Sequence, residues 1–222
     1  MLILGAGWTS TFLIPLLTRH HIPYSATTTT GRSGTLKFVF DPASDSPEPF
    51  KTLPAAHSIL ITFPLTGAGQ SARLLKLYRD THPGAAPNWI QLGSAGIFAV
   101  PGQTLWVTRR SKYDEANARA VAEDELLGLG GCVLNLSGLW GGERQARNWI
   151  GRVAGTKEQL GGKTSLHMVH GVDVARGIVA VSMAFTAGER WVGFFSGAWA
   201  VLAILPALST KGENGAANTF EA

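Results

Sequence analysis

The chain has 222 residues, 45% of them hydrophobic and 15% charged, which fits one globular α/β domain and excludes an intrinsically disordered protein. Its single cysteine, Cys132, excludes an intrachain disulfide framework and a metal site built from several thiolates, and we expect a cytoplasmic protein without a signal peptide. The net charge of +4 is compatible with anionic ligands, but the basic residues are scattered, with one tight cluster at Arg109, Arg110 and Lys112. We therefore expect no nucleic-acid partner, because such a surface needs a continuous basic face.

The first seven residues lead an apolar strand directly into a glycine turn, and the amphipathic segment 8–20 that follows predicts a helix. This order is typical of a site for the pyrophosphate of a dinucleotide. Gly5 permits the tight turn, Gly7 lets the backbone approach the phosphates, and the helix start presents N–H groups to the anion. Ser10 replaces the third glycine of G-x-G-x-x-G and is small enough for close helix–strand packing. The expected cofactor-binding residues of this turn are Gly5, Gly7, Trp8, Thr9 and Ser10. The alternative is an ordinary strand–helix turn.

Apolar, β-rich runs alternate with helical patterns along the rest of the chain, as in a parallel sheet with crossover helices. The expected strands lie near residues 1–5, 23–29, 35–40, 58–63, 89–93 and 131–137. The expected helices lie near residues 8–20, 66–80 and 113–128, with a shorter one that starts around residue 172. The predicted fold class is a three-layer α/β Rossmann fold with a doubly wound parallel sheet.

The end of the second predicted strand carries threonines and an arginine but no carboxylate. A dinucleotide fold that prefers NAD usually has Asp or Glu about 20 residues after the glycine turn, where it binds the ribose 2′-hydroxyl. Hydroxyls and a guanidinium suit a 2′-phosphate instead. Thr30 and Arg32 therefore favour NADP over NAD as the cofactor. Alternatively, the threonines reflect only β-propensity and Arg32 is a solvated turn residue.

Residues after the next two predicted strands are further candidates for the cofactor site. Asp41 follows the third strand, where it either accepts a hydrogen bond from the adenine amino group or caps the turn at Pro42. Phe63 and Pro64 end the fourth strand, where a ligand would cross the sheet edge. Pro64 either lines the cofactor or only terminates the strand.

The last third of the chain holds several features with two interpretations each. Arg144 and Arg147, after a Gly-Gly turn, either meet an anionic substrate or are solvated. His167 and His170 lie three residues apart, but no third ligand is apparent and we expect no metal site. Asp173 is expected to cap the helix that follows it.

An apolar run without any charged residue, 191–208, interrupts an otherwise soluble pattern. Its length, about 18 residues, is at the lower limit for a membrane span, but Gly193, Gly197 and Pro206 break it. We expect it to pack on the domain or on a second copy in a homodimer, rather than to cross a membrane. The expected division is a cofactor-binding domain over 1–188, an apolar segment over 189–208 and a disordered polar tail over 209–222.

Six segments within residues 1–185 form an ordered set of motifs. They are Gly5–Ser10, Thr29–Arg32, Gln91–Phe98, Ala122–Leu127, Leu136–Gly141 and Leu166–Ala175. Together they resemble the atypical and extended short-chain dehydrogenase/reductases, the NAD-dependent epimerase/dehydratase-like group. The resemblance implies a Rossmann domain that binds NAD(P), with a small C-terminal part that shapes the pocket of a small-molecule substrate. After residue 188 the chain departs from the family pattern, and its substrate region looks shortened.

The resemblance also implies catalytic residues, for which the match is partial. Ser94 falls where the family has its catalytic serine, whose hydroxyl can bind a substrate carbonyl or alcohol; otherwise Ser94 is a small turn residue. The family pairs a tyrosine with a lysine four residues later, which lowers the pKa of the phenol. Tyr113 is the candidate tyrosine, but Asn117 stands in the lysine position. Two functions stay open: an NAD(P)-dependent oxidoreductase or epimerase-like enzyme acting on a small carbonyl or alcohol, and a catalytically silent NADP(H)-binding sensor or interaction protein.

Overall fold

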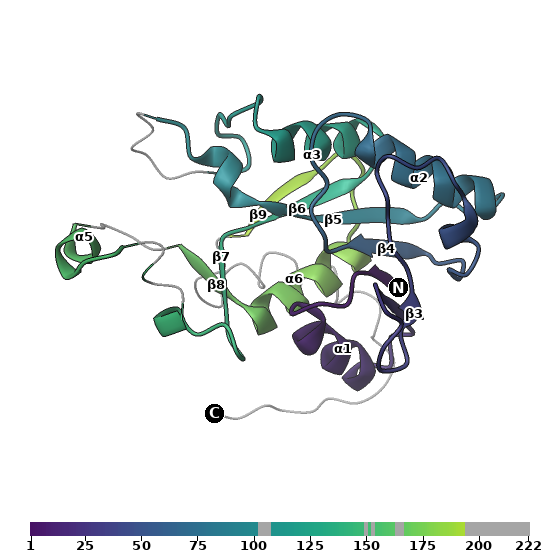
Figure 1. Ribbon diagram of the computed structural model, residues 1–222, viewed down its shortest axis with the longest axis horizontal. Coiled ribbons are helices and arrows are strands. Elements are labelled where there is room, and N and C mark those ends of the chain that lie inside the picture. Colours follow the sequence, from purple (N-terminus) through teal and green to yellow (C-terminus); the bar gives the residue numbers. More distant parts are fainter. Residues whose placement is uncertain (102–107, 149–150, 152–153, 163–166, 194–222) are drawn as a thin grey trace, which may run out of the picture.

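The structure is a computed structural model that describes residues 1–222 apart from residues 102–107, 149–150, 152–153, 163–166 and 194–222. Within these described residues, the chain forms a seven-stranded sheet in which every neighbouring pair of strands is parallel (Figure 1). The strand order is β3-β2-β1-β4-β5-β6-β9. The strands are β1 (Leu2–Leu4), β2 (Ser25–Thr28), β3 (Leu36–Lys37), β4 (Ser58–Ile61), β5 (Asn88–Ser94), β6 (Cys132–Leu136) and β9 (Arg190–Gly193). The order reverses between β1 and β4, as in doubly wound Rossmann folds, and confirms the predicted fold class.

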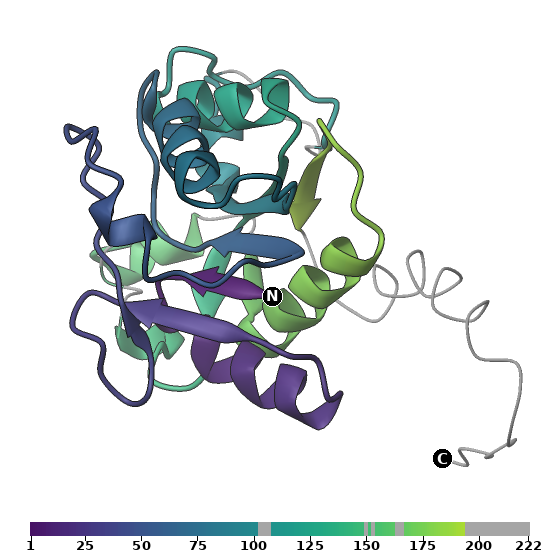
Figure 2. The same cartoon turned by 90° about the vertical axis from the view of Figure 1, so that its right-hand side faces the viewer.

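Helices cover both faces of the sheet (Figure 2). On one face α1 (Ser10–Arg19) packs against α6 (Gly171–Met183), and on the other α2 (Gln70–Thr81) packs against α3 (Ala118–Gly128). Shorter helices lie in the connections: α5 (Lys157–Gly161) and the 3₁₀ helices η1 (Glu48–Phe50), η2 (Ala95–Phe98) and η3 (Ala146–Asn148). The three layers follow from the alternation of strand and helix patterns along the chain.

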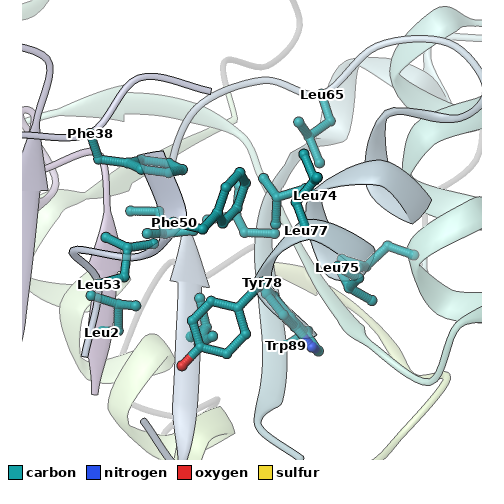
Figure 3. Close-up of a cluster of buried hydrophobic side chains, with 14 of the residues drawn as sticks. Leu2, Phe38, Phe50, Leu53, Leu65, Leu74, Leu75, Leu77, Tyr78 and Trp89 are labelled. Atoms are coloured by element: carbon teal, nitrogen blue, oxygen red, sulfur yellow. The ribbon is translucent and has the colours of Figure 1, made fainter. Parts of the chain in front are cut away.

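Each face of the sheet has its own buried core, because successive strand residues point to opposite faces. On β1, Ile3 joins the cluster beneath α1 and α6, whereas Leu2 and Leu4 join the cluster beneath α2 and α3. Figure 3 shows the second cluster, in which the rings of Tyr78 and Trp89 meet edge to face with centroids 5.4 Å apart. The central strands are therefore apolar on both faces, as is usual for a parallel sheet between two helix layers.

The helix expected over residues 113–128 is shorter in the structure and begins at Ala118. Asn117 precedes it in an extended conformation, and its side-chain oxygen accepts a hydrogen bond from the Arg119 N–H. This is N-cap geometry, which fixes where a helix starts. Tyr113 therefore lies in the loop before α3 and not on the helix.

The last helix among the described residues, α6, begins at Gly171, and its cap differs from the expected one. His170 is the N-cap, since its Nδ1 accepts a hydrogen bond from the Val172 N–H. Asp173, the expected cap, lies inside the first turn and pairs with Arg176 at 3.3 Å. The prediction missed the cap because a histidine ring nitrogen can replace the usual hydroxyl or carboxylate acceptor.

The sheet differs from the predicted one at both edges. The third strand, expected over 35–40, is limited to Leu36–Lys37. At the opposite edge β9 pairs with β6, with Arg190 opposite Val133, so the sheet continues past the expected boundary at residue 188. The rest of the apolar segment, 194–208, and the tail, 209–222, lie outside the described residues. Among the helices that the structure describes, none is long and apolar enough to cross a membrane.

A second, smaller sheet lies at the N-terminal end of α6 (Figure 1). It consists of β7 (Gly138–Trp140) and β8 (Met168–His170), which are parallel, with Trp140 opposite His170. β8 leads directly into α6. Neither strand belongs to the expected set, although β7 follows the predicted strand 131–137 directly in the sequence.

Candidate functional site

The turn between β1 and α1 contains two glycines with different roles. Gly5 has a φ of +93°, and a Cβ there would lie 2.7 Å from Thr62 Oγ1, so both its backbone conformation and its packing require glycine. A Cβ at Gly7 would meet no described atom within 4 Å beyond its chain neighbours. The fold therefore does not need glycine at position 7, whereas a ligand that approaches the backbone there does.

The N-terminal end of α1, directly after this turn, is open. Its N-cap, Thr9, makes no side-chain capping bond, and the first turn contains no acidic residue. Within the described chain, no backbone acceptor pairs with the N–H groups of Trp8 and Thr9. Ser10 is buried, and its hydroxyl has no partner among those residues either. Unpaired N–H groups at the positive end of a helix dipole form a site for an anion.

Threonines at the end of β2 organise both neighbouring loops. Thr27 Oγ1 accepts a hydrogen bond of 3.0 Å from the Gly5 N–H. Thr28 Oγ1 accepts from the N–H groups of Gly31 and Arg32, at 2.9 and 3.2 Å. The first contact braces the glycine turn and the others fold the loop after β2. These two threonines therefore do more than satisfy β-propensity.

Two cations lie at the edge formed by β2 and β3. Arg32 is exposed and forms none of the ion pairs found in the described residues. Lys37 lies opposite Thr28 in the register of the two strands and is also exposed. Thr30 is exposed in the same loop, and residues 29–35 contain no acid. Lys37 was not among the candidates from the sequence, because its nearness to this loop depends on the β2–β3 register.

The remaining cofactor-site candidates differ in their contacts. Asp41 lies beyond the end of β3, is exposed, and its Oδ1 accepts a hydrogen bond of 2.9 Å from the Ala43 N–H. In the structure the Asp41 carboxylate therefore binds the backbone of its own turn. Phe63 follows β4, stacks on Phe40 with ring centroids 6.1 Å apart, and lies next to the glycine turn, where a Cβ at Gly5 would be 3.3 Å from its ring. Pro64 follows Phe63 and is exposed.

Ser94 ends β5, and its backbone N–H, its carbonyl and its hydroxyl oxygen each have a hydrogen-bond partner. Its backbone N–H donates to Glu123 Oε1 at 3.0 Å, and its carbonyl accepts from Asn135 Nδ2 at 3.0 Å. Its Oγ accepts from the Gly96 N–H at 3.1 Å and thereby caps η2. The hydroxyl oxygen thus uses one lone pair in the turn, and the hydroxyl proton stays available for a further acceptor.

A buried ionic network fixes the backbone around Ser94. Glu123 is fully buried, and its Oε2 accepts from Asn135 Nδ2 at 2.7 Å and from Arg190 Nη1 at 2.5 Å. Arg190 also donates to Asn135 Oδ1 at 2.9 Å and to Asp124 Oδ1 at 2.6 Å. A Cβ on the neighbouring residue, Gly93, would lie 2.6 Å from the Glu123 carboxylate, so glycine makes room for the network. Charged groups can be buried at a tolerable cost when each of them makes several hydrogen bonds, as these do.

Tyr113 belongs to the outer end of this network. Its hydroxyl donates to Asp124 Oδ1 at 2.9 Å, its ring packs edge to face on Phe98, and the Arg190 guanidinium lies 4.9 Å from its ring centroid. Burial, together with the hydrogen bond to Asp124, raises the pKa of Tyr113. Catalysis by the family's tyrosine would need the opposite shift. The described contacts hold the hydroxyls of Tyr113 and Ser94 on different partners, and a catalytic role for Tyr113 stays a prediction.

Aromatic side chains connect the glycine turn to the small β7–β8 sheet. Trp8 Nε1 donates to the Gly141 carbonyl at 3.1 Å, and the Trp8 ring meets Phe12 edge to face at 4.9 Å. Phe12 in turn contacts His170, which contacts Trp140, with centroids 5.5 and 4.6 Å apart. His170 is therefore a cap and a packing residue, and in the described chain no group of three or more His, Cys, Asp or Glu residues could hold a metal ion. Sequence reasoning missed this junction because its two halves lie far apart in the chain.

Comparison with protein-family models finds no match, and comparison with curated proteins finds none either. Solved structures are similar to the chain at low sequence identity. The dTDP-glucose 4,6-dehydratase from Bacillus anthracis, solved in complex with NAD, has a TM-score of 0.61 and 15% identity over 96% of this chain and 82% of that one. Vestitone reductase from alfalfa has a TM-score of 0.60 and 18% identity over 86% of this chain and 75% of that one.

Two further structures extend this comparison. RMD from Pseudomonas aeruginosa, solved with NADPH, has a TM-score of 0.59 and 13% identity over 86% of this chain and 75% of that one. The UDP-N-acetylglucosamine 4-epimerase from Bacillus cereus has a TM-score of 0.60 and 11% identity over 86% and 76% of the two chains. The expected resemblance is therefore confirmed at the level of the fold: the chain has the Rossmann fold of these dehydratase, reductase and epimerase structures.

Proposed function

We propose that the chain binds a dinucleotide cofactor where β1, β2 and β4 end, with the pyrophosphate against Gly7 and the N-terminal end of α1. The observation that carries this proposal is that no described atom beyond the chain neighbours fills the space at Gly7, beside N–H groups of Trp8 and Thr9 that are unpaired among the described residues. Pyrophosphate binding in this fold needs both a backbone that a phosphate can approach and N–H groups directed at it. The likeness to structures solved with NAD and with NADPH supports the same cofactor class.

The preferred cofactor in this proposal is NADP. Arg32 and Lys37 are exposed cations without a carboxylate in the loop between them, and Thr28 folds that loop through its hydroxyl. A 2′-phosphate would provide the counter-charge, and an arginine fork can bind it with two charge-assisted hydrogen bonds. The unphosphorylated ribose of NAD would find no acidic partner in this loop.

We further infer an NAD(P)-dependent oxidoreductase or epimerase-like activity on a small carbonyl or alcohol. A bound nicotinamide would accept or supply the hydride. Ser94 supports this inference because its hydroxyl keeps a proton that can be donated to a substrate oxygen, and because Glu123 and Asn135 hold its backbone on both sides.

A second function, a catalytically silent NADP(H)-binding sensor or interaction protein, is favoured by one specific observation. The Tyr113 hydroxyl donates to Asp124, its pKa is raised, and Asn117 stands where a lysine would lower it. The two functions share the cofactor site and differ in turnover. Oxidation of NADPH in the presence of small aldehydes and ketones, lost in Ser94→Ala, supports the enzyme; cofactor binding without any turnover supports the silent protein.

Calorimetric titration with NADPH and NADH tests the cofactor proposal. The wild type should bind NADPH about tenfold more tightly or better, since a charge-assisted hydrogen bond to phosphate contributes about 1.5–3 kcal/mol. Arg32→Ala should weaken NADPH binding alone. Arg19→Ala, which changes an exposed arginine at the other end of α1, is the matched control and should change neither affinity. Equal affinities in the wild type contradict the NADP preference, and binding of neither dinucleotide contradicts the site itself.

A further inference from the structure

An additional cation lies beside the glycine turn, on the loop that follows β7. The guanidinium carbon of Arg144 lies over the Trp8 ring, 4.6 Å from its centroid. A cation–π contact of this kind holds an arginine in place without neutralising its charge. Arg144 is exposed, and the ion pairs of the described residues do not include it. Its N–H donors are therefore available to a ligand.

The backbone fixes the loop of Arg144 on Trp8. Gly141 and Arg144 exchange two backbone hydrogen bonds, of 3.0 and 3.1 Å, which close a tight turn. The carbonyl of Gly141 also accepts the hydrogen bond from Trp8 Nε1. Gly142, with a φ of +56°, approaches Phe12 so closely that a Cβ would lie 3.4 Å from the ring. These contacts fix the backbone of Arg144 at a defined position relative to the glycine turn.

The charge of Arg144 adds to an end of α1 that is already positive. The first turn of this helix contains no acidic residue, and the N–H groups of Trp8 and Thr9 are unpaired in the described structure. A cation near a helix N-terminus is unfavourable by itself. A bound anion compensates for this repulsion, because it interacts favourably both with the helix end and with the guanidinium.

We propose that Arg144, held on Trp8, is an anion-binding residue of this site and takes a phosphate oxygen. The inference rests on the proposed dinucleotide function. Arginine is suited to the role because its planar fork makes two parallel hydrogen bonds to phosphate while its face stacks on an aromatic ring. The phosphate comes either from the pyrophosphate of the cofactor or from a substrate bound beside it, and the two sources give different results in the same experiment.

The experiment compares Arg144→Met with Arg147→Met in the full chain. Methionine keeps an unbranched apolar stem against Trp8 and removes the charge, and Arg147 is an exposed arginine on the same segment, which makes it a matched control. Calorimetric titrations use NADP⁺, NAD⁺ and adenosine 2′-monophosphate. If Arg144 binds the cofactor pyrophosphate, Arg144→Met weakens NADP⁺ and NAD⁺ equally, by about tenfold or more, and leaves adenosine 2′-monophosphate unchanged. Arg144→Lys should lie between the wild type and Arg144→Met.

A second titration identifies a substrate source. Inorganic phosphate is added to protein saturated with NADP⁺, and a loss of phosphate affinity in Arg144→Met, with unchanged dinucleotide affinity, assigns Arg144 to a substrate phosphate. Unchanged binding of both dinucleotide and inorganic phosphate overturns the inference. A wild type that binds no dinucleotide, but whose binding of inorganic phosphate depends on Arg144, overturns the proposed function and leaves the anion-binding role of Arg144 supported.

Discussion

Two helices of this fold follow the same tripeptide but differ at their N-terminal ends. Gly5-Ala6-Gly7 precedes α1, and Gly67-Ala68-Gly69 precedes α2. The N-terminal end of α2 is occupied by the chain itself, since the carboxylate of Glu125 accepts hydrogen bonds from three N–H groups, those of Gly69, Ser71 and Ala72. The end of α1 has no acidic residue in its first turn and no side-chain cap. A glycine turn therefore becomes a candidate anion site only where the fold supplies no carboxylate of its own.

The source of this difference is a run of three acids on α3. Glu125 caps α2, Glu123 binds the backbone of Ser94 and the guanidinium of Arg190, and Asp124 binds Arg190 and Tyr113. All three lie on a helix that packs on the α2 face of the sheet, opposite α1 (Figure 2). Acids of α3 therefore neutralise the N-terminal end of α2 and the guanidinium of Arg190, whereas the first turn of α1 contains no acid to do the same.

The largest expected effect separates the two glycine turns by substitution. Gly7→Val should lower the affinity for NADPH and NADH at least about a hundredfold, because the side chain blocks phosphate from several N–H donors. It should leave the free energy of unfolding almost unchanged, since a Cβ at Gly7 meets no described atom beyond its chain neighbours within 4 Å. Calorimetry and denaturant unfolding measure the two quantities.

Gly69→Val is the matched control and should give the reverse pattern. Gly69 has a φ of +87°, which a β-branched residue adopts only at a cost of about 1–3 kcal/mol, so the loss should appear in stability. Dinucleotide affinity should persist in the folded fraction. Tight dinucleotide binding by Gly7→Val would remove the contrast between the two turns.

The next effect concerns the internal cap of α2. Glu125→Ala leaves three N–H groups without their carboxylate and should lower the free energy of unfolding by about 2 kcal/mol. Glu115→Ala, which removes an exposed acid before α3, should change stability by less than about 0.5 kcal/mol. Thermal unfolding with added sulfate gives a second test. Sulfate should raise the unfolding temperature of Glu125→Ala more than that of the wild type, because an anion can bind the N-terminal end of α2 once the Glu125 carboxylate is removed. Equal stability of Glu125→Ala and the wild type would show that the cap contributes nothing.

The sequence predicts those parts of the fold that depend on local patterns. The strand–turn–helix at Gly5 and Gly7, the alternation of strands and helices, and the parallel sheet follow from periodicity and from the position of the glycines. The prediction is less accurate at the edges of the sheet. β9 lies in an apolar run, and the pattern of that run does not distinguish a strand from a helix or a packing segment. The start of α3 was misplaced because the Asn117 cap decides it, and not the apolar periodicity upstream.

The site was predictable only where its residues are close in the chain. Glu123 and Arg190 are 67 positions apart, and Trp8 and Gly141 are 133 apart, so neither the network under Ser94 nor the junction at Trp8 leaves a local signal. The two Gly-Ala-Gly turns look alike in the sequence for the same reason, since the carboxylate that separates them comes from another helix. The missing Tyr–Lys couple, in contrast, is visible in the sequence as Tyr113 and Asn117, and in the structure the Tyr113 hydroxyl donates to Asp124.

The smallest expected effect tests whether Tyr113 belongs to the ionic network of α3 or to the proposed cofactor site. Tyr113→Phe removes the hydrogen bond to Asp124 and should lower the free energy of unfolding at pH 7 by about 1 kcal/mol. Burial and Asp124 raise the pKa of Tyr113 in the folded state, so the unfolded chain loses this proton first as the pH rises through about 10, and the wild type loses stability there. The deficit of Tyr113→Phe should therefore shrink above about pH 10, whereas NADPH affinity at pH 7 should match the wild type. Tyr24→Phe, which changes an exposed tyrosine, is the control and should show neither effect. Denaturant unfolding at a series of pH values measures the deficit. A deficit that stays constant across this range would contradict the raised pKa of Tyr113, and weaker NADPH binding by Tyr113→Phe would assign Tyr113 to the cofactor site.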